Sequence, residues 1–438
     1  MISTTLTQDE RALIEELDNA IANNQRQTLE FQNQRAGAMT MLLRARKIRE
    51  GQWDFRNGAL VRVDAEGQVP ILVRNAIAAR DANQAELGIQ FAQEAVAGGD
   101  ASATPRLVQA ACLGDLCRYE EALEVIEKAL RECSEDQHEL IRHERGFQRL
   151  LNKQWKDGWA DWDCRVQHRQ MGENLEKAWP GIKEWDGSPN RRVLVCGEKG
   201  LGDSVLFARY LKVLLDRGCT LQFLAGKAST AFSEVLRGRP GIYGAYGGDD
   251  AVPQVSEMWI SLESLPRFLA DSGEIPAPFD FQTTWNPPPR AGRPLRVGIC
   301  WHGHTVFSAS KHRRPEDLKY WEPILAKGGV EFLSLQLGER GPCAEELPAN
   351  SSVLDTVRRA CSCDLVISMD TSVVHMTASA GVPIWMPLHK LNYWPWIMTD
   401  AEHTVWYPSM RVFRQDGDGW EGVFHEIAEQ LQSKVREG

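Results

Sequence analysis

The spacing of hydrophobic residues changes once along the chain, near residue 190. Before that point apolar residues recur every three or four positions over long stretches, which predicts amphipathic helices. After it, short apolar runs such as 192–197 alternate with helix-like segments, which is typical of a parallel sheet with crossover helices. The pattern therefore predicts a helical N-terminal part followed by an α/β part.

The two ends of the chain have simple patterns. One long polar helix is predicted from about residue 8 towards residue 49, and residues 53–63 fit a hairpin around an Asn-Gly turn. We assign residues 1–70 to an N-terminal helical extension. An amphipathic pattern near the other end predicts a C-terminal helix within residues 416–438.

Small residues recur at nearly constant spacing in the helices that follow. Gly88, Ala122 and Gly158 are 34 and 36 residues apart, and another small residue stands twelve positions before each. Small side chains at fixed helical offsets let two helices pack closely, as in tetratricopeptide (TPR) repeats. A plain helical bundle is the alternative. We expect TPR-like repeats over residues 71–175.

Aromatic residues are concentrated in two places. Trp155, Trp159 and Trp162 share one helix face, and we expect them to pack the repeats onto the next domain rather than to bind a ligand. Residues 388–415 hold several more aromatic rings, which can stack on bases and sugars but also fill cores. We favour packing for most of these.

Two α/β sets are predicted, separated by a proline-rich stretch (274–294) that lacks periodicity and is interpreted as a linker. They correspond to domains at 190–275 and 295–415. Two doubly wound domains joined in this way form a cleft between the carboxyl ends of their strands, where such sheets bind ligands. The predicted strands are 192–197, 219–225, 258–262, 295–301, 330–336, 363–370 and 382–388.

A glycine-rich turn follows the first of these strands. Gly197, Gly200 and Gly202 have the spacing G-x-x-G-x-G, which is neither the dinucleotide motif nor a P-loop. Glycines there allow a close backbone approach, and the following helix N-terminus favours an anion. Asp203 stands where that helix begins. It is a candidate functional acid, and the alternative is a simple helix N-cap.

The second α/β domain has a turn that suits a phosphate. Asp370, Thr371 and Ser372 follow a predicted strand and open a helix, so hydroxyls and helix N–H groups would face an anion. Asp370 would repel a phosphate, and we expect it to face a sugar hydroxyl or to orient a hydrogen bond. His375 could donate to an anion, with a buried core histidine as the alternative.

A basic cluster lies in the loop after the first strand of that domain. The cluster consists of Lys311, His312, Arg313 and Arg314. Lysine complements a diphosphate as a point charge, and arginine does so as a bidentate fork. An ordinary solvated charge run is the alternative. The position at a strand end facing the Asp370 turn favours an anion pocket.

Composition narrows the class of protein. The net charge of −10 over 438 residues argues against a general nucleic-acid binder. Ten scattered cysteines without paired metal spacing suit a reducing cytoplasm, and the polar N-terminus does not resemble a signal peptide. The sequence contains no run of 18 apolar residues, so it predicts no membrane-spanning helix. The DGDG segment at 416–419 lacks further ligands, so we interpret it as a turn and expect no metal.

Several linked segments in order resemble one family. CGEKGLGDSVLFARYLKVL, RVGICWHGH, VEFLSLQLGE, CDLVISMDTSVVHMTASAGVP and VWYPSMRVFRQDGDGWEGVF are similar to TPR-containing glycosyltransferases related to the heptosyltransferases of family 9. The similarity covers roughly residues 100–430. It implies a GT-B fold, with two Rossmann-like domains and a nucleotide-sugar donor in the second, and usually no metal.

The resemblance also implies roles for particular residues. Asp203 matches the proposed general base, Lys311 matches a basic residue that contacts the donor phosphates, and Asp370, Thr371 and Ser372 match the turn that binds donor sugar and diphosphate. Ser372 replaces a glycine frequent in heptosyltransferases, so heptose is not carried over as the donor sugar.

The sequence thus predicts a cytoplasmic, inverting, metal-independent glycosyltransferase with a nucleotide-sugar co-substrate and no other cofactor. We expect a protein or peptide acceptor, presented with the help of the TPR-like region. The alternatives are a saccharide, lipid-linked or modified nucleic-acid acceptor, or a TPR interaction protein whose α/β part has lost catalysis.

Overall fold

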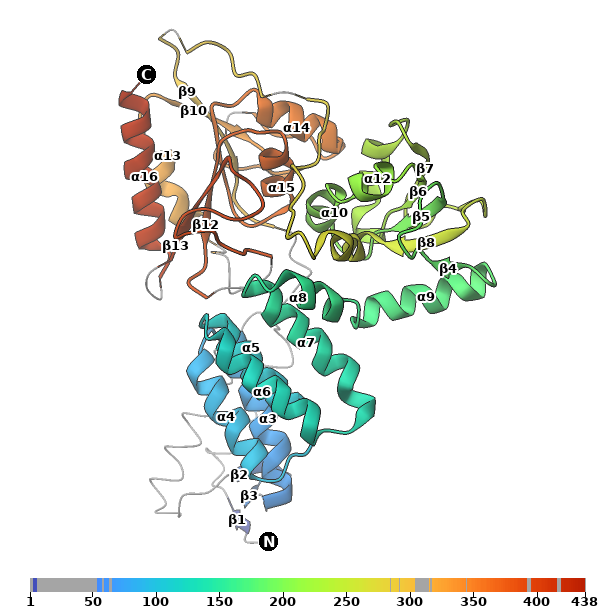
Figure 1. Ribbon diagram of the computed structural model, residues 1–438. Helices are drawn as coiled ribbons and strands as arrows, with labels where there is room; N and C mark the ends of the chain where they lie inside the picture. The colour runs from blue at the N-terminus through green and yellow to red at the C-terminus, as the bar shows by residue number, and fades with distance from the viewer. Residues whose placement is uncertain are drawn as a thin grey trace. The chain divides into compact units, whose positions relative to one another are not determined.

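The computed structural model describes residues 3–5, 53–56, 59–62, 65–283, 285–290, 292–303, 315, 317–343, 345–391, 395–415 and 419–437 (Figure 1). It divides into two compact units, Met1–Ile141 and Arg142–Gly438. The predicted long helix at 8–49 lies outside the described residues. The predicted hairpin is confirmed, because β2 (Trp53–Arg56) pairs antiparallel with β3 (Ala59–Arg62), which also pairs with β1 (Ser3–Thr5).

Among the described residues, four α-helices lie wholly within the first unit. The small residues of the predicted repeat lie where these helices meet, and Ala76 and Ala122 are fully buried. A Cβ built on Gly88 would lie 2.7 Å from Sγ of Cys112 and 3.3 Å from the carbonyl oxygen of Ala76. The close spacing of the helices therefore requires a residue without a side chain at Gly88. The helices are α3 (Ala65–Asp81), α4 (Ala85–Ala97), α5 (Ala103–Asp115) and α6 (Tyr119–Glu132), and a short η1 (Glu135–Gln137) follows.

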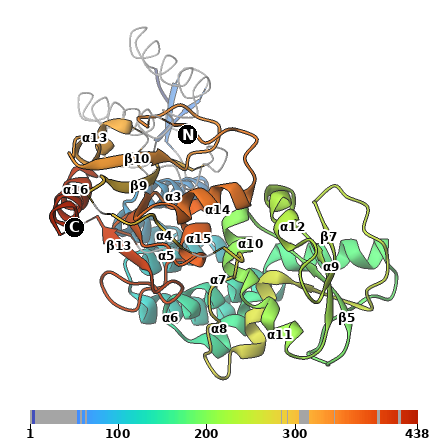
Figure 2. The ribbon, with the colours of Figure 1, turned by 90° about the horizontal axis from the view of Figure 1, so that it is seen from above.

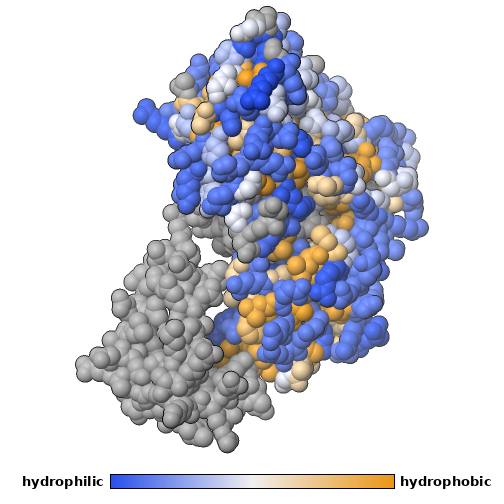
Figure 3. Space-filling model, turned by 90° about the vertical axis from the view of Figure 1, so that its left-hand side faces the viewer, coloured by the Kyte–Doolittle hydropathy of each residue, from blue (hydrophilic) through white to orange (hydrophobic). Residues whose placement is uncertain are grey.

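Some large apolar side chains of this helical region face solvent. Ile77 of α3 is 42% exposed and Leu87 of α4 is 37% exposed. In the view of Figure 3, apolar side chains gather in the lower part of the surface. Exposed apolar surface of this kind is available to a binding partner.

The third helix pair repeats the same spacing. A Cβ on Gly146 would lie 2.8 Å from the backbone nitrogen of Trp162, and one on Gly158 would lie 2.9 Å from Cγ of Leu150. The pair is α7 (His138–Leu151) with α8 (Trp155–Trp162), and α9 (Val166–Ala178) follows. The helical N-terminal part predicted from the sequence is confirmed.

The first α/β domain is a five-stranded parallel sheet of order β4-β8-β5-β6-β7. The chain runs from β5 outwards to β7 and then returns to the other side of β5, so the strand order reverses between β5 and β8. The strands are β4 (Lys183–Glu184), β5 (Arg192–Cys196), β6 (Thr220–Leu224), β7 (Ile242–Tyr246) and β8 (Met258–Ser261). Between them lie α10 (Leu201–Ala208), α11 (Leu211–Leu215), η2 (Lys227–Ser229) and α12 (Thr230–Leu236), and η3 (Leu262–Leu269) follows β8.

The second α/β domain has the parallel order β10-β9-β11-β12-β13, which reverses between β9 and β11. Its core is built from apolar residues of these strands and of α16, such as Ile299, Ile367 and Phe424. The strands are β9 (Leu295–Cys300), β10 (Val330–Ser334), β11 (Leu365–Ser368), β12 (Ile384–Leu388) and β13 (Met410–Arg414). The helices are η5 (Leu318–Trp321), α13 (Glu322–Leu325), α14 (Val353–Cys361), α15 (Ser372–Ser379) and α16 (Glu421–Arg436).

The predicted fold class is confirmed, with two parallel α/β sheets after a helical region. Three strands of the two α/β sheets were not predicted. β4 has only two residues, β7 contains Gly244, and β13 is a short run with two arginines. Among the described residues of the predicted linker 274–294 there is no helix or strand. In the part of the chain that the structure describes, no helix has the length and apolar character needed to cross a membrane.

Candidate functional site

The glycine turn connects β5 to α10 and carries Asp203. α10 begins at Leu201 with Gly200 as its N-cap, so Asp203 is the third helical residue and not the cap. The backbone N–H of Gly200 lowers the pKa of the Asp203 carboxyl, and a Cβ on Gly200 would lie 3.6 Å from Oδ2 of Asp203. The carboxylate therefore lies beside the backbone at the start of the helix, where free N–H groups favour a negative charge.

A Cβ on either of the other two turn glycines, Gly197 and Gly200, would make only ordinary van der Waals contacts. A Cβ on Gly197 would lie 3.5 Å from the backbone nitrogen of Gly226, in the turn after β6. The N–H of Gly197 donates to the carbonyl of Leu224 at 2.9 Å, and the N–H of Glu198 donates to the Glu263 carboxylate at 3.3 Å. These two N–H groups are therefore bound within the protein and do not form an open phosphate cradle.

The N-terminal ends of α10 and α15 lie against each other (Figures 1 and 2). Gly202 is the point of closest approach, because a Cβ there would lie 3.4 Å from Cα of Ser372 and closer still to the His375 ring. The structure thus brings the Asp203 turn of the first α/β domain to the Asp370–Ser372 turn of the second, as the sequence predicts for the two sides of one cleft.

The surroundings of Asp203 raise the pKa of its carboxyl above the ordinary value. Burial raises the pKa of its carboxyl, and the Asp370 carboxylate raises it further, whereas Lys199 and the N–H of Gly200 lower it. A carboxylate is a better general base when its pKa is moved towards the working pH.

The Asp370–Ser372 turn follows β11 and opens α15. Thr371 is the N-cap, and its hydroxyl accepts from the N–H of Val373 at 3.2 Å. β9 and β11 are paired neighbours, with Ser368 opposite Cys300. The loop after β9 therefore starts beside this turn, at the point where the strand order reverses. Lys311, Arg313 and Arg314 of that loop lie outside the described residues.

His375 is 5% exposed and lies in an aromatic environment. Its ring stacks on Trp396 with centroids 5.1 Å apart, and Nδ1 lies 3.0 Å from the Tyr407 hydroxyl. Burial lowers its pKa to about 4, so the ring is neutral at pH 7. These contacts favour the core-histidine interpretation, in which the residue shapes the junction of α10 and α15.

The structure adds polar residues that the sequence did not single out. At the end of β9, the backbone N–H of His302 donates to the side-chain carbonyl of Gln336 at 3.2 Å, and His302 Nε2 lies 2.6 Å from the Glu339 carboxylate. His302 and Glu339 follow predicted strands and Gln336 ends one, and that position was the available signal. Arg209, at the end of α10, donates to the carbonyl of Trp406 at 2.9 Å and so links the two α/β domains.

The tryptophans of α8 pack as predicted. Trp159 meets Phe207 of α10 edge-on at 6.1 Å, and Trp155 meets Trp406 at 6.3 Å. Trp396, Trp406 and Tyr407 of the aromatic segment are buried, so packing is confirmed for them. Tyr393, Trp394 and residues 416–418 of the DGDG segment lie outside the described residues.

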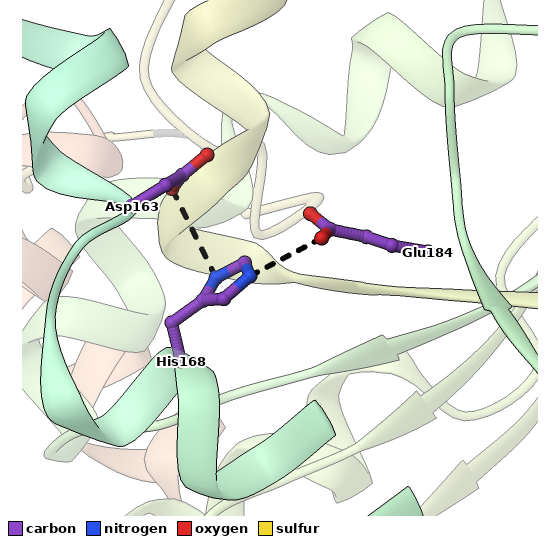
Figure 4. Close-up of side chains that lie close together, drawn as sticks. All are labelled: Asp163, His168 and Glu184. Atoms are coloured by element: carbon purple, nitrogen blue, oxygen red, sulfur yellow. Dashed lines mark hydrogen bonds and ion pairs between the residues drawn. The ribbon is translucent and has the colours of Figure 1, made fainter. Parts of the chain in front are cut away.

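One group among the described residues has the spacing of a metal site. Ligand atoms of Asp163, His168 and Glu184 lie within 4.8 Å of one another (Figure 4). Two guanidinium groups already neutralise the acids, because Arg165 donates to Asp163 at 2.8 Å and Arg267 pairs with both Asp163 and Glu184. A cation here would compete with both arginines, so the group fits an ion-pair network better than a metal centre.

The chain matches no protein-family profile. It is 25% identical over 325 residues to the Caulobacter vibrioides protein FlbA, which covers 63% of this chain and 52% of that protein. The chain thus spans about half the length of this relative.

Two of the solved structures to which it is similar are glycosyltransferases. TibC, an iron-containing dodecameric glycosyltransferase of enterotoxigenic E. coli H10407, matches 57% of this chain and 76% of its own at 10% identity and a TM-score of 0.40. A family 9 glycosyltransferase of Veillonella parvula matches 57% of this chain and 98% of its own at 13% identity and a TM-score of 0.37. The strand orders of the two parallel sheets define the fold.

Proposed function

We propose that the chain is an inverting glycosyltransferase that uses a nucleotide-sugar donor. The observation that carries the proposal is the junction of α10 and α15, where Gly202 packs against Ser372 and places Asp203 near Asp370. Sugar transfer needs a base for the acceptor proton and positive groups for the departing nucleotide diphosphate. We assign the base to the first side of this junction and the positive groups to the second side, where the sequence adds Lys311, Arg313 and Arg314.

The donor diphosphate is assigned to the second α/β domain. The hydroxyls of Thr371 and Ser372 and the N-terminal N–H groups of α15 suit a phosphate, and the sequence places Lys311 in the loop that starts at the neighbouring strand. The equivalent point of the first domain, between β5 and β8, is filled by the protein's own Arg165, Glu198 and Glu263. A diphosphate would meet two carboxylates there.

Asp203 is assigned as the general base. Its raised pKa and its position on the opposite side of the junction suit the removal of a proton from an acceptor hydroxyl as the donor bond breaks. The charge stabilisation of the leaving group is assigned to the basic loop and the start of α15, so the mechanism needs no metal ion.

The acceptor is assigned to a protein or peptide, bound with help from the helical region. That region has repeated helix pairs and exposes Ile77 and Leu87. The two elements assigned to the donor diphosphate, the Asp370–Ser372 turn and the loop with Lys311, both lie in the second α/β domain. A chain reduced to residues 142–438 should keep nucleoside diphosphate affinity and lose transfer to the natural acceptor. Loss of diphosphate binding with the fold intact would contradict this division.

The central experiment is a donor screen. A set of nucleoside diphosphates and nucleotide sugars is tested for a rise in unfolding temperature, since a ligand specific to the folded state stabilises it. The donor found is then incubated with peptide, oligosaccharide and lipid-linked acceptors, and products are weighed by mass spectrometry. Absence of any nucleotide effect and of any product would favour the alternative of a TPR interaction protein without catalysis.

A further inference from the structure

A buried arginine outside the proposed catalytic residues contacts the turn that carries Asp203. Arg165 lies between α8 and α9, and its side chain is 1% exposed. Nε and Nη2 donate to the two carboxylate oxygens of Glu198, both at 2.7 Å. Such a paired arrangement fixes the direction of both groups as well as their distance.

The same guanidinium also contacts the neighbouring strand end. Nη2 lies 2.8 Å from the hydroxyls of both Ser261 and Ser264, which belong to the end of β8 and to η3. Nη1 donates to the carbonyl of Trp162 and to Asp163. Arg165 therefore joins the helical segment to both strands at the point where the order of the first sheet reverses.

The contacts also balance charge. The carboxylates of Glu198 and Glu263 are both buried here, and Glu263 accepts from the N–H of Glu198 and the hydroxyl of Ser261. Two neighbouring buried carboxylates repel each other unless a cation lies near both. Without Arg165, the turn would have to move to bring Glu198 to water.

The turn is held a second time by the residue next to Glu198. The ammonium of Lys199 lies 4.4 Å from the centre of a Trp162 ring, within range of a cation–π contact. Trp162 belongs to α8, so both polar residues between Gly197 and Gly200 are fixed by the helical segment that precedes the sheet.

We propose that Arg165 is a positioning residue, which holds Glu198 and thereby sets the direction in which Asp203 faces the junction of α10 and α15. The link is short, because Asp203 lies five residues after Glu198, and a Cβ on Gly200 between them would lie 3.6 Å from Oδ2 of Asp203. The proposal rests on the proposed function for the role of Asp203, but the holding of the turn is measurable without it.

The test uses the full chain with Arg165→Met, Arg165→Lys and the double variant Arg165→Met/Glu198→Met. Arg267→Met is the matched control, because Arg267 pairs with Asp163 and Glu184 of the same network and donates to the carbonyl of Trp185 rather than to residues 197–203 of the turn. The readouts are unfolding temperature, amide hydrogen exchange of residues 197–208, affinity for UDP, GDP and ADP, and turnover with the donor found by the screen.

In Arg165→Met, exchange of residues 197–208 should rise and turnover should fall by about 10²-fold, the effect of misplacing a catalytic group by about 1 Å. Nucleoside diphosphate affinity should not change. For Arg165→Lys, the exchange rate and the turnover should both lie between those of wild type and Arg165→Met, because lysine keeps the charge but not the paired geometry. The double variant should regain unfolding temperature, because the Glu198 carboxylate is removed together with its partner, but its turnover should stay low. Arg267→Met should lower the unfolding temperature but leave the exchange of residues 197–208 and the turnover unchanged.

Normal exchange in Arg165→Met, or recovery of turnover together with unfolding temperature in the double variant, would overturn the proposal and leave Arg165 as a structural residue. If the wild-type chain transfers no sugar, the proposed function fails. The exchange data then decide by themselves whether Arg165 holds the turn.

Discussion

Gly202 of α10 and His375 of α15 lie so close that a Cβ on the glycine would be 2.8 Å from Cδ2 of the imidazole. His375 is stacked on Trp396 and cannot move aside easily. The contact therefore sets the distance between the turn that carries Asp203 and the turn that carries Asp370.

Gly202→Ala should separate the two helix ends. We expect a loss of about 1–3 kcal/mol in unfolding free energy, as for other overpacked sites, and a larger relative loss of turnover. Denaturant unfolding and transfer rates measure the two effects. Gly328→Ala is the control, since a Cβ there meets nothing within 4 Å and both quantities should stay near wild type. Unchanged turnover in Gly202→Ala would separate the α10–α15 junction from catalysis.

Asp203→Asn should remove the general base with little change in stability. An amide oxygen can still accept from the N–H groups at the start of α10, but the amide cannot take the acceptor proton. Turnover should fall by about 10²–10⁴-fold while donor affinity stays near wild type. Asp216→Asn, on the exposed surface of the same domain, is the control. Near-normal turnover of Asp203→Asn would leave Asp203 as a helix-start residue only.

Lys311→Ala should weaken binding of the donor diphosphate. A hydrogen bond to a charged group contributes about 1.5–3 kcal/mol, so affinity should fall by about ten- to a hundredfold in calorimetry. Lys319→Ala removes an exposed lysine paired with Asp317 and serves as the control. Equal affinities of the two variants would reject the assignment of Lys311.

Chelation should leave donor binding and turnover intact. The carboxylates of Asp163 and Glu184 are paired with arginines, and the leaving-group charge is assigned to Lys311 and the start of α15. The measurement is turnover and metal content after dialysis against EDTA. Loss of activity that Fe²⁺, Mg²⁺ or Mn²⁺ restores would contradict the expectation, and His168→Ala would then show whether the group in Figure 4 holds the metal.

Glu263 should make stability fall as the pH rises. Burial, together with the charge of Glu198, raises its pKa from 4.5 to about 7, although Arg165 and Lys199 oppose this. A carboxyl with a raised pKa in the folded state favours folding while it is protonated, and this contribution is lost as the pH rises through about 7. The unfolding temperature of Glu263→Gln minus that of wild type should therefore increase between pH 5 and pH 8. A constant difference would show that Glu263 does not titrate in this range.

Much of the candidate site could be predicted from residues near strand ends. Asp203 and the Asp370–Ser372 turn directly follow apolar runs, and in parallel sheets such positions share one edge. His302 and Gln336 occupy equivalent positions, but ordinary polar residues after a strand carry no motif. Arg165, Arg209 and Glu263 gave no signal, because a lone charged residue in a helical or loop pattern is usually solvated.

The sequence by itself determined the order of helices and strands, because periodicity reflects which side of each element is buried. It also determined where small residues must lie between helices, at Gly88 and Gly158. Only the tertiary structure decided that N–H groups of the glycine turn donate to other parts of the protein, that Gly202 packs against α15, and that Arg165 joins the helical segment to the turn. These contacts connect residues far apart in the chain, so their geometry depends on how whole elements pack, which local patterns do not encode.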